Sequence, residues 1–138
     1  MYGHCDASQG LLLGAMVDYA THSLIHPPVS NRFMNNIVVI GKSVSNPSVI
    51  ATTNQHFAKL SANMSISSNL YFQEGRSLAT AANLFPLGSY AEWRMSGWDK
   101  GSIIDADPDF LNASGGDFSI RPGSPALRVF KPLPMPTC

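Results

Sequence analysis

The chain has 138 residues, of which 44% are hydrophobic and only 13% are charged, and its nine basic residues balance nine acidic ones. This composition argues against an intrinsically disordered chain. The basic residues are scattered singly, which argues against nucleic acid as a partner, because phosphate recognition needs a clustered basic stripe. The longest apolar run, residues 11–17, is far shorter than the ~20 residues that cross a bilayer, so we expect no membrane contact.

The two ends carry little that directs or cross-links the chain. The first five residues, Met1 to Cys5, have neither the basic nor the apolar region of a signal peptide. The chain has two cysteines, Cys5 and Cys138, at opposite ends. Two cysteines do not make a disulfide framework, and we expect no bridge between them.

Short apolar or alternating runs bounded by Gly, Asn, Pro or Ser predict a series of β-strands. In chain order these runs are residues 11–13 with 16–17, then 37–40, 48–52, 63–67, 70–72 and 117–121. Apolar runs of three or four residues are typical of strands that are covered on both faces or stacked inside a solenoid. The sequence therefore predicts an all-β fold built from short stacked strands.

A weak repeat supports the stacking. Asn35-Asn36-Ile37-Val38 and Ser68-Asn69-Leu70-Tyr71 share a polar residue, an asparagine and two apolar residues. Asparagine before a strand tolerates the left-handed region and can hydrogen-bond to its own copy in the next coil. Repeat arrays use coils of roughly 20–30 residues, so the wider spacing of these two copies predicts an insertion in one coil.

One helix interrupts the strands. Ser89 and Glu92 form a capping box, which predicts a helix over residues 90–96 with Gly97 just after its end and Trp93 packed inward. After it, the chain is divided by prolines and glycines. In residues 131–136 every second residue is a proline, which predicts an extended tail. We therefore divide the chain into a β-domain over residues 1–130 and a tail over residues 131–138.

The closing third carries two motifs with specific spacing. The first runs Trp93-x3-Gly97-Trp98-Asp99-x2-Ser102-Ile103-x3-Asp107-Pro108-x-Phe110. The second runs Gly116-Asp117-Phe118-Ser119-Ile120-x-Pro122-Gly123-Ser124-Pro125-Ala126-Leu127. Together they resemble the closing segment of right-handed parallel β-helix proteins related to glycoside hydrolases and polysaccharide lyases.

This resemblance implies the terminal coils of a longer solenoid with one helical excursion. It also implies an extracellular or periplasmic protein that cleaves or binds polysaccharide or oligosaccharide. His26 falls on a family histidine in this register, whereas His4 and Cys5 stand where the family often has an acidic pair. That difference makes it uncertain whether the chain is an enzyme.

The candidate catalytic residues are His26 and Asp6. On a solenoid face His26 could act as a general acid or base or hold a sugar hydroxyl, although a non-catalytic histidine is the favoured alternative. Asp6 and Asp18 could supply the two carboxylates, roughly 5–10 Å apart, that glycoside hydrolysis needs. Nothing in the sequence pairs them, and a surface or turn role is favoured.

The candidate substrate-binding residues are Trp98 and Tyr71, whose rings could stack on sugars or cap a hydrophobic core. Residues 105–109, with aspartates at three alternate positions, resemble the start of a calcium loop. The loop lacks the glycine and glutamate of an EF-hand, so turn capping is preferred to a looser Ca²⁺ site and we expect no cofactor. Asn63-Met64-Ser65 and Asn112-Ala113-Ser114 match the N-glycosylation sequon.

Two functions from different classes remain. The first is the end of a polysaccharide-degrading enzyme that is not catalytic by itself. The second is a non-catalytic structural or glycan-binding module.

Overall fold

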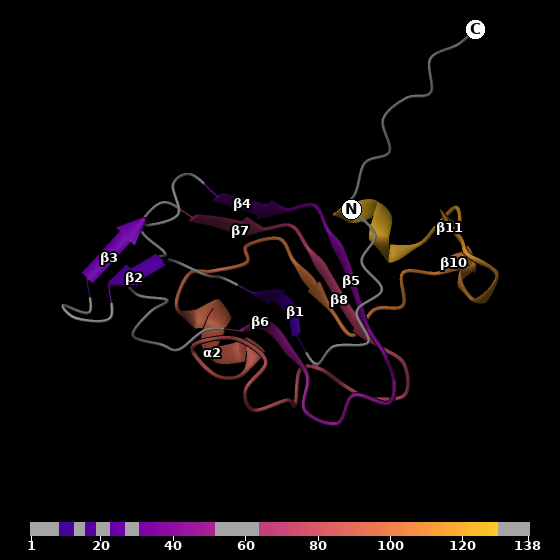
Figure 1. Ribbon diagram of the computed structural model, residues 1–138. Coiled ribbons are helices and arrows are strands. Elements are labelled where there is room, and N and C mark those ends of the chain that lie inside the picture. Colours follow the sequence, from indigo (N-terminus) through magenta and orange to yellow (C-terminus); the bar gives the residue numbers. More distant parts are fainter. Residues whose placement is uncertain (1–8, 13–15, 19–22, 27–30, 52–63, 130–138) are drawn as a thin grey trace, which may run out of the picture.

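The computed structural model describes residues 9–12, 16–18, 23–26, 31–51 and 64–129 of the chain (Figure 1). These residues form short strands, one α-helix and two 3-10 helices. The expected all-β class is therefore confirmed. Among the described residues no helix is long and apolar enough to span a membrane. Asp6, both cysteines and the proline-rich tail lie outside the described residues.

Most strands pair in parallel with a strand far away in the sequence. The three-stranded sheet has the order β5 (Ile37–Ile40), β8 (Leu70–Gln73) and β9 (Ile103–Ile104). In its register Ile37 pairs with Leu70, and Leu70 pairs with Ile103. Each step from one strand to the next therefore takes the same number of residues along the chain.

Two further parallel pairs accompany this sheet. Strand β4 (Asn31–Met34) pairs with β7 (Met64–Ser67), and β1 (Gln9–Leu12) pairs with β6 (Ser48–Ala51). Figure 1 shows β4 and β7 side by side, leading through a bend into β5 and β8, which also lie side by side. Parallel strands need long crossover connections, which is why neighbours in space lie so far apart in the sequence.

The bends between successive strands repeat as well. Asn35, Ser68 and Gly101 all have positive φ angles, of 56°, 53° and 75°. Each precedes a polar residue that hydrogen-bonds to its equivalent in the neighbouring bend. A left-handed backbone costs an ordinary residue roughly 1–2 kcal/mol. The hydrogen bonds between neighbouring bends offset this cost and hold each bend in the same conformation.

The core lies between the strands and the helix α2 (Tyr90–Met95). Strand β7 buries Met64 and Ile66 while Ser65 faces solvent, which is the alternation of a half-buried strand. Trp93 of α2 is fully buried and stacks on Phe85, with ring centroids 5.0 Å apart. The predicted capping box and the inward Trp93 are confirmed. The helix ends at Met95, one residue before the predicted end, with Ser96 as its C-cap and Gly97 following at a φ of 89°.

The remaining elements are antiparallel or helical. Strand β2 (Met16–Asp18) pairs with β3 (Ser23–His26), and β10 (Phe110–Asn112) pairs with β11 (Asp117–Ile120). We predicted one strand from residues 11–13 and 16–17. That prediction is wrong, because β1 and β2 are separate strands in different sheets. The short helices η2 (Ala113–Gly115) and η3 (Pro125–Arg128) follow near the end.

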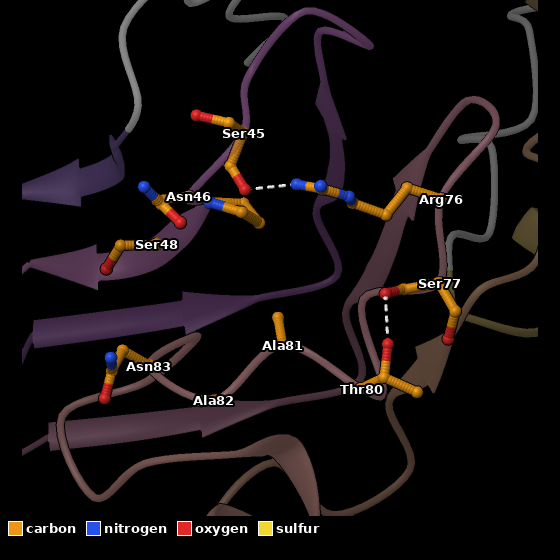
Figure 2. A pocket seen from close by; sticks show the side chains of 10 residues that line it. Ser45, Asn46, Ser48, Arg76, Ser77, Thr80, Ala81, Ala82 and Asn83 are labelled. Atoms are coloured by element: carbon orange, nitrogen blue, oxygen red, sulfur yellow. Dashed lines mark hydrogen bonds between the residues drawn. The ribbon is translucent and has the colours of Figure 1, made fainter.

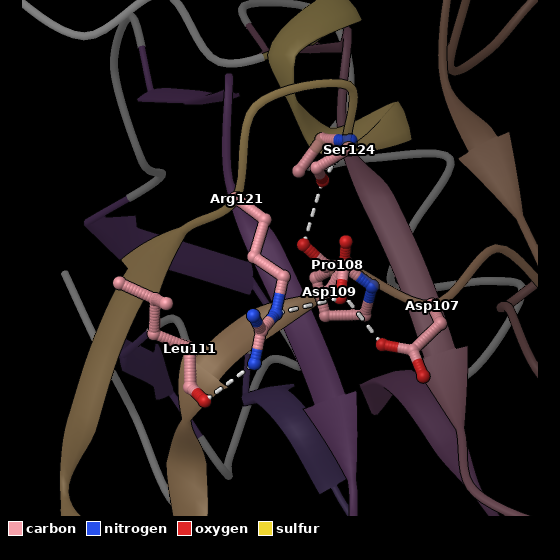
Figure 3. A network of polar contacts seen from close by, with 7 residues as sticks. Asp107, Pro108, Asp109, Leu111, Arg121 and Ser124 are labelled. Carbon is pink, nitrogen blue, oxygen red and sulfur yellow. Dashed lines mark hydrogen bonds and ion pairs between the residues drawn. The ribbon is translucent and has the colours of Figure 1, made fainter.

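Polar contacts join the two arms of the β10–β11 hairpin at its base (Figure 3). Arg121 forms an ion pair with Asp109 at 3.2 Å and donates to the Leu111 carbonyl at 2.8 Å. Ser124 is buried and donates to the Pro108 carbonyl at 2.6 Å. These contacts close the base of the hairpin.

Candidate functional site

A polar pocket lies between two connecting segments. One wall is the turn before β6, and the other is the segment that leads from β8 toward α2 (Figure 2). The pocket encloses about 520 Å³, within the roughly 300–1,000 Å³ of small-molecule sites. Its lining is made of residues that are mostly exposed: Ser45, Asn46, Pro47, Ser48, Arg76, Ser77, Thr80, Ala81, Ala82 and Asn83.

Gln73, the last residue of β8, holds the first wall in place. Its Nε2 donates to the carbonyls of Gly41 and Val44, each at 2.9 Å. Because one side-chain amide serves both carbonyls, the turn after β5 is tied to the end of β8. Gln73 is 1% exposed, and its Oε1 has no hydrogen-bond partner among the described residues.

Arg76 crosses from the second wall to the first. Its guanidinium donates to the Val44 carbonyl at 3.4 Å and to the Ser45 carbonyl. Figure 2 shows the side chain extended across the gap toward Ser45. Arg76 is the only charged residue of the lining, and no described carboxylate forms an ion pair with it. The pocket therefore offers hydroxyl, amide and guanidinium groups.

The second wall is held by a carboxylate from the next bend. Asp105 accepts hydrogen bonds from the Leu78 and Ala79 amides, at 2.6 and 3.3 Å, and from the Ser77 hydroxyl. Asp105 thus caps the turn that begins at Ser77. The turn role preferred for residues 105–109 fits this contact, and it fits Asp107, which accepts from the Asp109 amide at 2.8 Å. Within the described residues no three His, Cys, Asp or Glu side chains converge as a metal site.

The largest polar network is buried beneath α2 and does not reach the pocket lining. Asp99 is fully buried, and its Oδ2 accepts from the Tyr71 hydroxyl at 2.6 Å and from Trp93 Nε1 at 3.1 Å. Its Oδ1 accepts from Asn69 Nδ2 at 3.1 Å and from the Ser102 hydroxyl. This carboxylate therefore joins two bends, one strand and the helix.

Tyr71 is part of that network. Its ring has no exposed surface, so it offers no face to a sugar, and we withdraw it as a substrate contact. Burial raises the pKa of the Tyr71 hydroxyl well above its ordinary value, and the negative charge of Asp99 raises it further. Tyr71 therefore acts as a hydrogen-bond donor inside the core.

Trp98 packs on the same cluster from outside. Its ring stacks on Trp93, with centroids 5.3 Å apart and planes 16° apart. Trp98 is partly exposed, so it covers the core while one part of the ring reaches solvent. It is not among the residues that line the pocket, and its role as a sugar contact stays a prediction.

The two candidate catalytic residues are not brought together by the described part of the chain. His26 is the last residue of β3, and its backbone pairs with Met16. Nothing further is described at His26, and Asp6 lies outside the described residues. The pocket residues Asn46, Arg76 and Asn83 were not predicted from the sequence. They lie in polar loops about 30 residues apart, and only the pairing of the strands before each loop brings them together.

Comparison with protein-family models, with curated proteins and with solved structures finds no match to this chain. Its function must therefore be argued from its own geometry.

Proposed function

We propose that this chain forms the closing coils of a right-handed parallel β-helix in a carbohydrate-active protein, and that its own task is to bind polysaccharide. The solenoid is supported by the parallel register that joins Ile37, Leu70 and Ile103 at equal steps. Crossovers between parallel strands of one sheet are right-handed in nearly all proteins. The two closing motifs point to the same class of fold.

The observation that carries the binding role is the chemistry of the pocket. Seven of its ten lining residues have side chains that can hydrogen-bond: Ser45, Asn46, Ser48, Arg76, Ser77, Thr80 and Asn83. Hydroxyls and amides both donate and accept, as the hydroxyls of a sugar do. A saccharide unit could therefore exchange hydrogen bonds with both walls, from Asn46 on one side and Asn83 on the other (Figure 2).

The carboxylates favour binding over cleavage for these coils. Hydrolysis by the usual route needs two carboxyl groups facing one glycosidic bond. In residues 31–51 and 64–129, the carboxylates of Glu92, Asp99, Asp105, Asp107, Asp109 and Asp117 all accept hydrogen bonds or form ion pairs that fix turns or the helix. Glu74 is exposed and has no such partner there. Cleavage by His26 and Asp6, together with residues of further coils, is the alternative.

The test is binding of the purified chain to a panel of neutral and acidic polysaccharides by affinity electrophoresis. The double variant Asn46→Ala/Asn83→Ala should weaken binding about tenfold, because it removes two hydrogen-bonding side chains worth about 0.5–1.5 kcal/mol each. Asn112→Ala is the matched control, because Asn112 is an exposed asparagine on the distant β10–β11 hairpin. It should bind like the unchanged chain.

Reducing-sugar release is measured on the same samples. Binding without release supports the binding role. Release that disappears in His26→Ala would instead favour the enzyme. Equal binding by the double variant and the control would mean that the pocket is not the polysaccharide site.

A further inference from the structure

The tip of the β10–β11 hairpin is the most exposed part of the described chain. Every residue from 111 to 117 is exposed. Figure 1 shows the hairpin at the margin of the molecule, on the far side of the parallel strands from α2. The hairpin is nevertheless ordered, because Phe110 and Phe118 pack edge to face at 5.4 Å and Arg121 holds its base. It presents a fixed turn to solvent.

Within this turn, the side chain of Asn112 is bound at its oxygen and not at its nitrogen. Oδ1 accepts from the Gly115 amide and from the Ser114 hydroxyl, each at 3.1 Å. Nδ2 makes no hydrogen bond with any described residue. Gly115 allows this geometry, because a Cβ at that position would lie 2.3 Å from Asn112 Nδ2. The amide nitrogen is thus left at the surface beside the hydroxyl of Ser114.

We propose that Asn112 is an acceptor for N-linked glycosylation when the chain passes through a secretory compartment. Asn112-Ala113-Ser114 satisfies the sequon, whose middle residue must not be proline. The donor is an oligosaccharide linked to a polyprenyl diphosphate, used by an oligosaccharyltransferase. Asn112 Nδ2 forms the bond to C1 of the first sugar and loses a proton. The bond from C1 to the diphosphate oxygen breaks, and the lipid diphosphate leaves with the electron pair.

Two other asparagines of the chain, Asn46 and Asn63, also have a serine two residues later. Asn63-Met64-Ser65 also fits the sequon, but Met64 is buried and Ser65 is paired with Arg32 between β7 and β4. Asn46-Pro47-Ser48 has proline in the middle position, which blocks the reaction. The structure therefore favours Asn112 over the other two. This inference is independent of the polysaccharide pocket, which lies on different loops.

The test is expression of the full chain behind a signal peptide in a eukaryotic secretory host. The secreted protein should migrate more slowly by the mass of one N-glycan and return to the unmodified position after treatment with peptide N-glycosidase. Asn112→Gln and Ser114→Ala should lose the shift. Ser114→Thr should keep it, because the hydroxyl is retained, and Asn63→Gln should keep it as well.

Site mapping on the unchanged chain guards against variants that fail to fold. Release of the glycan in ¹⁸O-labelled water converts the modified asparagine to labelled aspartate, and the label should be at position 112. An unmodified secreted chain would overturn the proposal. So would a label found only at position 63, or a shift that survives in Asn112→Gln and disappears in Asn63→Gln.

Discussion

At the scale of single residues, Asp99 connects more of the molecule than any other buried polar group described. Its two carboxylate oxygens accept from Tyr71, Trp93, Asn69 and Ser102, which belong to separate parts of the chain. Buried donors that lose their acceptor cost about 1–3 kcal/mol each. The backbone at Asp99 is also left-handed, with φ 57°, a conformation that aspartate adopts more readily than most residues. Both properties explain why an acidic residue occupies this core position.

We therefore expect Asp99→Ala to destabilise the protein about 3 kcal/mol more than Asp109→Ala, measured by urea unfolding followed by far-ultraviolet circular dichroism. Asp109 is a matched control, because its φ is 52° and alanine meets the same backbone penalty there. Its ion pair with Arg121 is solvent-exposed and contributes only about 0–1 kcal/mol. Equal losses in the two variants would show that the buried network adds nothing.

The sequence contained part of this residue-level information. The capping box of Ser89 and Glu92 indicated a helix with Trp93 packed inward, and that packing is confirmed. The role of Asp99 was not predicted, because its four donors are 3 to 30 residues away along the chain. For Tyr71 two roles were open, stacking on a sugar or capping the hydrophobic core. Its burial and the hydrogen bond of its hydroxyl to Asp99, 28 residues away, decide for the core.

At the scale of elements, α2 is short and depends on its cap. Ser89 accepts from the Glu92 amide at 3.3 Å, and Glu92 accepts from the Ser89 amide at 2.7 Å. The hydrogen bonds that the Glu92 carboxylate accepts from the Ser89 amide and from the Ser89 hydroxyl lower the pKa of this carboxyl below its ordinary value. The ionised Glu92 carboxylate therefore contributes fully to the stability of the fold above the ordinary pKa of glutamate. This contribution is lost as the pH falls through the lowered pKa of Glu92.

Ser89→Ala should lower the free energy of unfolding by about 1 kcal/mol at neutral pH, because it removes an N-cap side chain. Thermal unfolding at neutral and at acidic pH measures this loss, which should shrink at acidic pH as Glu92 is protonated. Ser96→Ala is the control at the other end of the helix, where the hydroxyl only donates to the Glu92 carbonyl. It should change the free energy of unfolding by no more than a few tenths of a kcal/mol. A loss from Ser96→Ala as large as that from Ser89→Ala would contradict the capping argument.

Elements with a strong local pattern were predicted, and those without one were missed. Residues 37–40 form β5 as predicted, because Ile-Val-Val-Ile is β-branched throughout and ends at glycine. Strand β4, with the sequence Asn-Arg-Phe-Met, has no such pattern and is mostly exposed. Strand β9 is only two residues long. These two strands exist because a neighbouring strand supplies backbone partners, which a local pattern does not reveal.

At the scale of the whole molecule, a ladder of polar residues ties the bends together. The Asn36 amide and Nδ2 both donate to Asn69 Oδ1, at 3.0 and 3.1 Å. The Asn69 amide donates to the Ser102 hydroxyl at 2.8 Å. Each step covers 33 residues. The sequence revealed the first two members of this ladder. The third has serine in place of asparagine, so similarity alone did not reveal that the interval is regular.

In such a stack each strand contacts only its neighbours, so stability is a sum of local terms. Asn69 occupies the middle of the ladder and is fully buried. It donates to the Phe33 carbonyl at 3.0 Å in addition to its bonds with Asn36 and Asp99. Asn69→Ala should therefore loosen both interfaces of the sheet. Ser102→Ala removes contacts on the β9 side of β8 only, where the Ser102 hydroxyl accepts from the Asn69 amide and donates to Asp99.

Amide hydrogen exchange followed by mass spectrometry measures this difference directly. In the unchanged chain, protection should be highest in β8, which has a partner on each side, and lower in β5 and β9. Asn69→Ala should reduce protection in β5 and β9 together. Ser102→Ala should reduce it in β9 and leave β5 close to its original value. A uniform loss across all three strands in Ser102→Ala would mean that the sheet opens as one cooperative unit, and the nearest-neighbour account of this stack would be wrong.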